Sequence, residues 1–159
     1  ENDIGDFRTF LKLSPPLRTE EDRMSLVDAI NKNLIDVIVS DHKPEDEESK
    51  RLTFSQAATG ASGIETLLPL ALEQFHNNSI KLFKIIELLT SNPAKILKIN
   101  KGNLSIGNDA DFCIVDIEKP WIVKKEKLIS KSKNTSIEDK KLQGKVTNTF
   151  VKGKELFKL

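Results

Sequence analysis

The sequence predicts an α/β fold, in which residues 1–101 belong to a parallel α/β barrel and residues 102–159 form a small all-β unit. Three observations support this fold class. Segments with helical spacing of apolar residues surround a short β-branched run at residues 35–40. An Asp-His pair follows that run directly, and the catalytic residues of such barrels gather at the carboxyl ends of the strands. Beyond Gly102, short strand candidates replace the helical pattern.

The composition suits a soluble globular protein and excludes several other classes. With 159 residues, the chain is long enough for one ordinary domain with a core. Its net charge of +1 gives no general attraction to nucleic acid or anionic membrane, and no apolar run approaches the roughly 20 residues of a membrane span. Cys113 is the single cysteine, so no internal disulfide can form and we expect a cytoplasmic location. The start lacks Met and a signal-peptide pattern, which we interpret as a processed or truncated chain.

The first hundred residues alternate between helical and extended patterns. Thr19 can cap a helix that runs to about residue 33, and residues 35–40 are expected to form a buried strand. The loop from Asp41 to Gly63 is long enough to suggest a functional role. Three further helices are expected at about residues 67–75, 79–89 and 92–100, with Pro69 kinking the first of them or delaying its start.

The last sixty residues contain short runs of β-branched and aromatic residues. Gly, Asn and Pro separate these runs, which are typical of strands joined by turns. A turn is expected at residues 152 and 153. The predicted strands are residues 111–116, 121–123, 145–151 and 155–157.

Five segments, in order along the chain, point to one protein family. Residues 14–23 are Ser-Pro-Pro-Leu-Arg-Thr-Glu-Glu-Asp-Arg, and residues 37–44 are Val-Ile-Val-Ser-Asp-His-Lys-Pro. Residues 57–66 are Ala-Ala-Thr-Gly-Ala-Ser-Gly-Ile-Glu-Thr, and a tail includes residues 107–112 and 130–135. Together they resemble the long-chain bacterial dihydroorotases of the amidohydrolase superfamily. The matching family stretches are Asn-Pro-Pro-Leu-Arg-Ser/Thr-Glu-Glu-Asp-Arg, Thr-Asp-His-Ala-Pro-His and Gly-x-x-Gly-x-Glu-Thr.

The resemblance implies the final helices and strands of a (β/α)8 barrel, followed by the C-terminal part of a small β-sandwich. It also implies a metal-dependent enzyme that interconverts carbamoyl-aspartate and dihydroorotate in pyrimidine biosynthesis. By position, Asp41 is the carboxylate that contacts the metal and carries a proton from the attacking water to the departing nitrogen. The implied cofactor is zinc, one or two ions in the complete protein. Its other ligands would be histidines of earlier barrel strands, so we expect this chain alone to be inactive.

Four more positions are expected to contact the substrate. Ser14 replaces an asparagine of the family pattern, and Glu45 replaces the last histidine of Asp-His-Ala-Pro-His. An anion beside a dicarboxylate substrate should repel it, so Glu45 bears directly on which substrate is accepted. Thr59 and Gly60 match a loop whose backbone touches the substrate ring in the family. His42 and His76, the only histidines, are expected to be supporting and surface residues rather than metal ligands.

Three alternatives stay open. The first is another cyclic amidohydrolase, such as an allantoinase or a hydantoinase, which shares the barrel and the tail. The second is a non-catalytic homologue that scaffolds aspartate transcarbamoylase, favoured by Ser14, Lys43 and Glu45. The third is a free-standing binding module, which requires the chain to fold alone. The expected partners are the small-molecule substrate and, for the complete protein, a second copy or aspartate transcarbamoylase. Neither nucleic acid nor membrane is expected as a partner.

Overall fold

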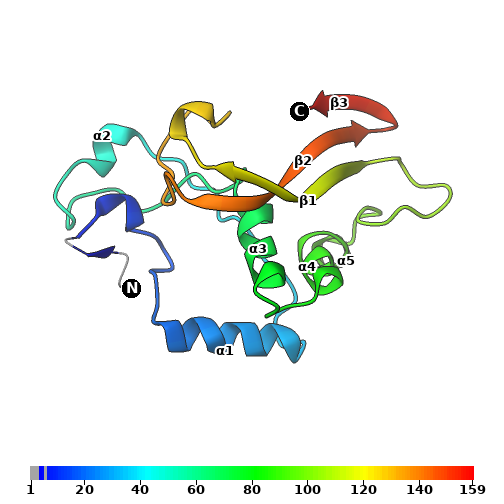
Figure 1. Cartoon of the computed structure of the whole chain (residues 1–159), viewed down its shortest axis with the longest axis horizontal. Helices are drawn as coiled ribbons and strands as arrows, with labels where there is room; N and C mark the ends of the chain where they lie inside the picture. The colour runs from blue at the N-terminus through cyan, green and yellow to red at the C-terminus, as the bar shows by residue number, and fades with distance from the viewer. Residues whose placement is uncertain (1–3, 6) are drawn as a thin grey trace. The chain divides into compact units, whose positions relative to one another are not determined.

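The structure is a computed structural model that describes residues 4, 5 and 7–159, and its fold is α/β (Figure 1). The chain divides into two compact units. Unit 1 comprises Glu1–Asp28, Ser40–Leu67 and Ile122–Lys141. Unit 2 comprises Ala29–Val39, Leu68–Trp121 and Leu142–Leu159. Each unit is assembled from segments that are far apart in the sequence.

Helix α1 (Glu20–Asn31) begins where the sequence predicts. The Thr19 hydroxyl accepts a hydrogen bond from the Asp22 N–H (3.2 Å), and the Asp22 carboxylate accepts one from the Thr19 N–H (3.3 Å). This reciprocal cap satisfies backbone donors that the first turn of a helix leaves free. The acidic residues of that turn also lie at the positive end of the helix dipole.

Residues 35–40 do not form the strand that the sequence predicts. The Ile38 N–H donates to the Leu88 carbonyl (3.2 Å), but the segment lies outside any strand and Val39 is 70% exposed. A parallel strand forms only beside neighbours that complete its backbone hydrogen bonds. The one sheet of the described residues, β1-β2-β3, does not include this segment. The prediction of a paired, buried strand is therefore wrong for the described chain.

Three helices supply much of the core of unit 2. Their apolar faces bury Leu72, Ile85 and Leu88 completely. Pro69 lies in the first turn of the first of these helices, where its missing N–H costs no helical hydrogen bond, so the helix starts before the proline. The helices are α3 (Leu67–His76), α4 (Leu82–Leu89) and α5 (Ser91–Ile96).

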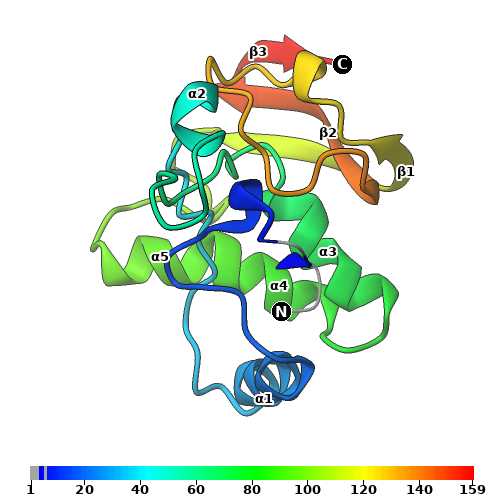
Figure 2. The ribbon, with the colours of Figure 1, turned by 90° about the vertical axis from the view of Figure 1, so that its left-hand side faces the viewer.

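The sheet of unit 2 has three strands in the spatial order β1-β2-β3, which lie side by side in Figure 2. The predicted strands at residues 111–116 and 121–123 form one continuous strand, because β1 is an edge strand and such strands tolerate a proline like Pro120. The strands are β1 (Phe112–Ile122), β2 (Lys141–Val151) and β3 (Lys154–Lys158).

Strand β2 turns tightly into β3 at one end and packs against a helix near the other. β2 and β3 pair antiparallel across Lys152 and Gly153, whose φ angles of 49° and 74° are typical of a tight type I′ turn. Near its other end, β2 passes close to α3 at Gly144, where an added Cβ would collide with the Leu72 side chain. Gly144 therefore lets the helix pack directly on the strand.

Unit 1 is held together more by polar contacts than by an apolar core. The predicted long loop contains one short helix, α2 (Glu47–Lys50), and 3-10 turns occur at Thr9–Leu11 and Lys125–Lys127. Its buried apolar side chains are few, and the buried polar ones, Lys50, Ser62, Thr66, Asn134 and Thr135, include a lysine with no exposed surface. Over the described part of the chain, the structure has no helix long and apolar enough to cross a membrane.

Candidate active site

All five residues that the sequence predicts as site residues lie in unit 1. Asp41 comes directly after the extended run, with an exposed side chain and a φ of 41°. This left-handed conformation is uncommon outside glycine, and Asp and Asn adopt it more easily than most residues. Among the described residues the Asp41 carboxylate has no hydrogen bond or ion pair, so its oxygens are available to a ligand.

His42 anchors the Asp41 loop to a second loop. Its Nδ1 accepts hydrogen bonds from the backbone N–H groups of Gly63 (3.1 Å) and Ile64 (3.3 Å). Because Nδ1 acts as an acceptor, the neutral ring has its proton on Nε2. Gly63 itself has no room for a side chain, since an added Cβ would lie 2.9 Å from the Ser40 carbonyl oxygen. The backbone on both sides of Asp41 is thus fixed against residues 63 and 64.

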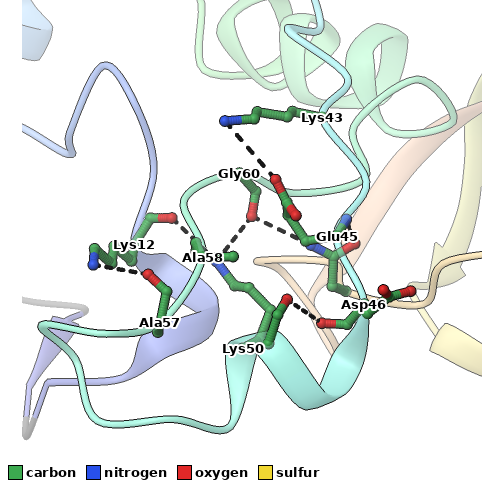
Figure 3. Close-up of polar contacts among 10 residues, drawn as sticks. Lys12, Lys43, Glu45, Asp46, Lys50, Ala57, Ala58 and Gly60 are labelled. Atoms are coloured by element: carbon green, nitrogen blue, oxygen red, sulfur yellow. Dashed lines mark hydrogen bonds and ion pairs between the residues drawn. The ribbon is translucent and has the colours of Figure 1, made fainter.

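Lys43 and Glu45, the two charged departures from the family pattern, face each other (Figure 3). The Lys43 Nζ lies 3.8 Å from a Glu45 carboxylate oxygen, and the Glu45 side chain is 26% exposed. The Lys43 N–H also donates to the Ala61 carbonyl (3.0 Å). The negative charge of Glu45 is therefore partly balanced by a cation two residues away.

Gly60 lies where no other residue fits without movement. Its φ is 137°, and an added Cβ would lie 2.7 Å from the Lys43 carbonyl oxygen. Its N–H donates to the Lys12 carbonyl (3.1 Å), and its carbonyl accepts from Lys50 Nζ (2.9 Å) and Asn134 Nδ2 (3.3 Å). Both backbone groups of Gly60 are therefore engaged within the chain. The other predicted residue of this loop is Thr59. It is half-buried, and its side chain makes no hydrogen bond among the described residues.

Ser14 is exposed, and its hydroxyl has no hydrogen bond among the described residues. It follows Lys12, whose ammonium donates to the carbonyls of Phe54 (2.7 Å), Ser55 (3.1 Å) and Ala57 (2.8 Å). The structure therefore brings the Ser14 segment against the loop that leads to Thr59. It shows no direct hydrogen bond or ion pair between Ser14, Asp41 and Glu45 within the described residues.

A network of buried polar groups, which sequence reasoning missed, joins this site to the tail segment. Asn134 Oδ1 accepts from the Glu45 N–H (3.2 Å) and from the Ser62 hydroxyl (3.1 Å), and Ser132 donates its hydroxyl to the Glu45 carbonyl. The only sequence signal for these contacts is that residues 57–66 and 130–135 both belong to segments shared with one family.

Glu65 makes the second connection between these two segments. Its spacing from Ser62 suggests a helix-capping pair, but both side chains are used elsewhere. The Glu65 carboxylate accepts from the backbone N–H groups of Ile129 and Ser130, each at 3.0 Å. A carboxylate that accepts several backbone N–H groups makes strong, charge-assisted bonds. Glu65 therefore fixes the turn at residues 129 and 130 rather than the start of α3.

The described residues do not supply a complete metal site. No cluster of three or more His, Cys, Asp or Glu side chains suited to a metal ion occurs among them. A catalytic zinc takes about three protein ligands. Asp41 offers one exposed carboxylate, and the His42 Nδ1 is already an acceptor for two backbone N–H groups. Within residues 4, 5 and 7–159, the side chains therefore do not form the ligand set of a catalytic zinc.

Comparison with known proteins gives consistent matches. The model of the amidohydrolase family matches residues 12–156. The chain is 40% identical over 158 residues to the dihydroorotase of Ehrlichia chaffeensis and 40% identical over 147 residues to that of Aquifex aeolicus. These matches cover 99% and 92% of this chain, which spans only 35% of the length of either relative.

Solved structures give the same picture at the level of the fold. The L-hydantoinase (dihydropyrimidinase) of Arthrobacter aurescens superposes with a TM-score of 0.90 at 29% identity, over 99% of this chain and 36% of that one. The dihydropyrimidinase of Brevibacillus agri superposes with a TM-score of 0.84 over 97% of this chain and 35% of that one, but at 22% identity it shows the fold alone.

Proposed function

Because the chain belongs to the amidohydrolase family, we propose that it forms the C-terminal portion of a dihydroorotase that interconverts dihydroorotate and carbamoyl-aspartate. The observation that carries this proposal is the 40% identity to the Ehrlichia chaffeensis dihydroorotase over 99% of the chain. The geometry supports it, since Asp41 has an exposed carboxylate, without a partner among the described residues, on a loop fixed through His42. The reaction belongs to pyrimidine biosynthesis, and the expected location is the cytoplasm.

In this proposal the chain is completed by the remainder of a protein about three times its length, as the 35% share of its relatives suggests. Residues 1–101 supply the end of a (β/α)8 barrel, and residues 102–159 supply part of a β-sandwich. Residues 35–40 then pair with barrel strands from outside this chain, which satisfies the backbone groups that the described residues leave unpaired. Asp41 would be one ligand of a zinc ion, and the remaining ligands would come from outside this chain.

The role of Asp41 is to move a proton. In the hydrolytic direction, water adds to the ring carbonyl carbon and its proton passes to the Asp41 carboxylate. As the carbon–nitrogen bond breaks, the carboxylic acid returns the proton to the departing nitrogen. The ring opens to carbamoyl-aspartate, and Asp41 is ionised again. An exposed carboxylate that has no competing partner in the described part of the chain is ready for both transfers.

Ser14 and Thr59 are the proposed side-chain contacts to the substrate, because both hydroxyls are free of described hydrogen bonds. Gly60 contributes by shape, since a side chain there would displace the backbone of Lys43. Glu45 lies beside the proposed site with its charge partly balanced by Lys43. This pairing reduces the repulsion of a dianionic substrate that the sequence alone suggests.

A hydantoinase is the second candidate, favoured by the TM-score of 0.90 to the Arthrobacter aurescens enzyme. Both reactions open a cyclic amide, and they differ in whether the substrate ring has a carboxylate. A purified full-length protein separates the two candidates through its kcat/KM values on dihydroorotate and hydantoin. We expect a preference for dihydroorotate of at least about 10²-fold. A preference for hydantoin would favour the second candidate. Inactivity on both, with stable binding to aspartate transcarbamoylase, would favour a non-catalytic scaffold.

A further inference from the structure

Lys50 is a fully buried cation in unit 1, with 0% of its surface exposed. Its Nζ donates to the backbone carbonyls of Lys12 (3.1 Å), Ala58 (2.9 Å) and Gly60 (2.9 Å). An ammonium group has three N–H donors, so these three carbonyls saturate it. Figure 3 shows the side chain reaching from α2 to the two backbone segments. A neutral amine has only two donors and would lose one of these three hydrogen bonds.

The three carbonyls belong to the segments with the proposed substrate contacts. Lys12 is two residues before Ser14, while Ala58 and Gly60 flank Thr59. Neither segment is part of a helix or a strand, so no ladder of backbone hydrogen bonds fixes its position. Among the described residues, one backbone–backbone hydrogen bond joins them, and this bond, from the Gly60 N–H to the Lys12 carbonyl, ends on an oxygen that Lys50 also binds.

We propose that Lys50 is a positioning residue for substrate binding, whose buried ammonium holds the Ser14 and Thr59 segments at a fixed separation. This inference rests on the proposed function and adds a residue to it. Lys50 does not touch the substrate. It acts through backbone carbonyls, so its loss changes where Ser14 and Thr59 stand rather than the chemistry at Asp41.

The charge of Lys50 depends on its surroundings. Burial lowers the pKa of its ammonium below the ordinary value of 10.5, Glu45 opposes this, and Lys12 and Lys43 add to it. Because the pKa is lowered, the third hydrogen bond is lost at a lower pH than an exposed lysine would allow. Substrate binding should therefore weaken as the pH rises through the alkaline range.

The experiment compares Lys50→Met and Lys50→Arg with wild-type full-length protein, and Arg51→Met is the matched control. Arg51 is the next residue and is exposed, with an ion pair to Glu47 (2.6 Å). We expect Lys50→Met to lower kcat/KM by roughly 10²-fold, mostly through KM, because misplacing binding groups by about 1 Å has effects of that size. Metal content should not change. Lys50→Arg should give a smaller loss and a KM that no longer rises at alkaline pH, because arginine stays charged.

Unchanged KM values in both folded Lys50 variants would overturn the inference. So would failure of both variants to fold, since Lys50 would then serve stability alone. The exchange rate of the Gly60 amide hydrogen gives a readout that needs no turnover, and we expect it to rise at least about tenfold in Lys50→Met. If the wild-type protein does not act on dihydroorotate, the proposed function fails. The amide exchange of residues 58–60 then still decides whether Lys50 positions these segments.

Discussion

At the scale of single residues, a substitution at Asp41 can remove the charge of the side chain without disturbing the backbone. Its φ of 41° is tolerated by asparagine as well as by aspartate, and no described hydrogen bond holds its carboxylate. We predict that Asp41→Asn in the full-length protein lowers kcat by at least about 10²-fold, because the proton-carrying oxygen is lost. The melting temperature should stay nearly unchanged.

The control for this variant is Asp46→Asn. Asp46 is an exposed aspartate on the same loop, and its side chain makes no capping hydrogen bond to α2. It should retain wild-type turnover and stability. Steady-state kinetics and thermal unfolding of the two variants give the comparison. Retention of more than about a tenth of the rate in Asp41→Asn would exclude a proton-transfer role for Asp41.

Glu45 gives a prediction about charge. Its carboxylate lies 3.8 Å from Lys43 Nζ, so Glu45→Gln removes an anion and releases a cation beside the proposed site. We predict a several-fold lower KM for dihydroorotate in Glu45→Gln and a higher KM in Lys43→Met, because the substrate is anionic. The KM differences should shrink at high salt. Weaker binding in Glu45→Gln would mean that Glu45 recognises a different, neutral or cationic, ligand.

At the scale of elements, the loop at Gly60 tests how tightly the site is packed. Gly60→Ala combines a φ of 137° with a contact of 2.7 Å to the Lys43 carbonyl oxygen. We predict a loss of about 1–3 kcal/mol in the free energy of unfolding, measured by denaturant titration. Gly107→Ala is the matched control, because its φ is 95° but its added Cβ meets nothing within 4 Å. Equal losses in both variants would mean that backbone strain alone, not the contact with Lys43, limits this position.

The helices were predictable from local sequence, and the strands were predictable only in part. Thr19 and the acids that follow it specify the start of α1 through contacts within one turn. Residues 35–40 have strand composition, but a strand also needs partners, and no described strand lies beside them. Pro120 suggests a break that does not occur, because whether a proline is tolerated depends on β1 being an edge strand. Sequence patterns contain the local part of this information and lack the part that depends on neighbours.

The site shows the same division between local and distant information. Asp41, Glu45 and Gly60 are recognisable from motifs that are contiguous in the chain. Lys50 and Asn134 are not, because each matters through backbone carbonyls or amides that lie far away in the sequence. A buried lysine in the acidic stretch after residue 45 is indistinguishable in sequence from an exposed one. Only the fold shows that three carbonyls converge on it.

At the scale of the whole molecule, the chain exposes many large apolar side chains. Leu34, Val39 and Phe83 are examples, each at least 70% exposed. We predict that the 159-residue chain expressed alone self-associates, binds no catalytic zinc and has no turnover, because apolar patches promote association and Asp41 is its one proposed ligand. Size-exclusion chromatography and zinc titration measure both properties. A sharp monomer peak with cooperative melting and micromolar zinc uptake would instead identify a self-sufficient domain.

The bonds from Glu65 to residues 129 and 130, and from Ser62 to Asn134, limit how this protein can be recombined with its relatives. A chimera that exchanges only residues 57–66 would place a foreign loop against a tail whose amides and amide side chain are spaced for the native one. A mismatch there leaves the carboxylate at position 65 without its backbone donors and the buried Asn134 Oδ1 without the hydroxyl that donates to it. Grafting experiments should therefore transfer residues 57–66 and 129–135 as one cassette, although more than sixty residues separate them in the sequence.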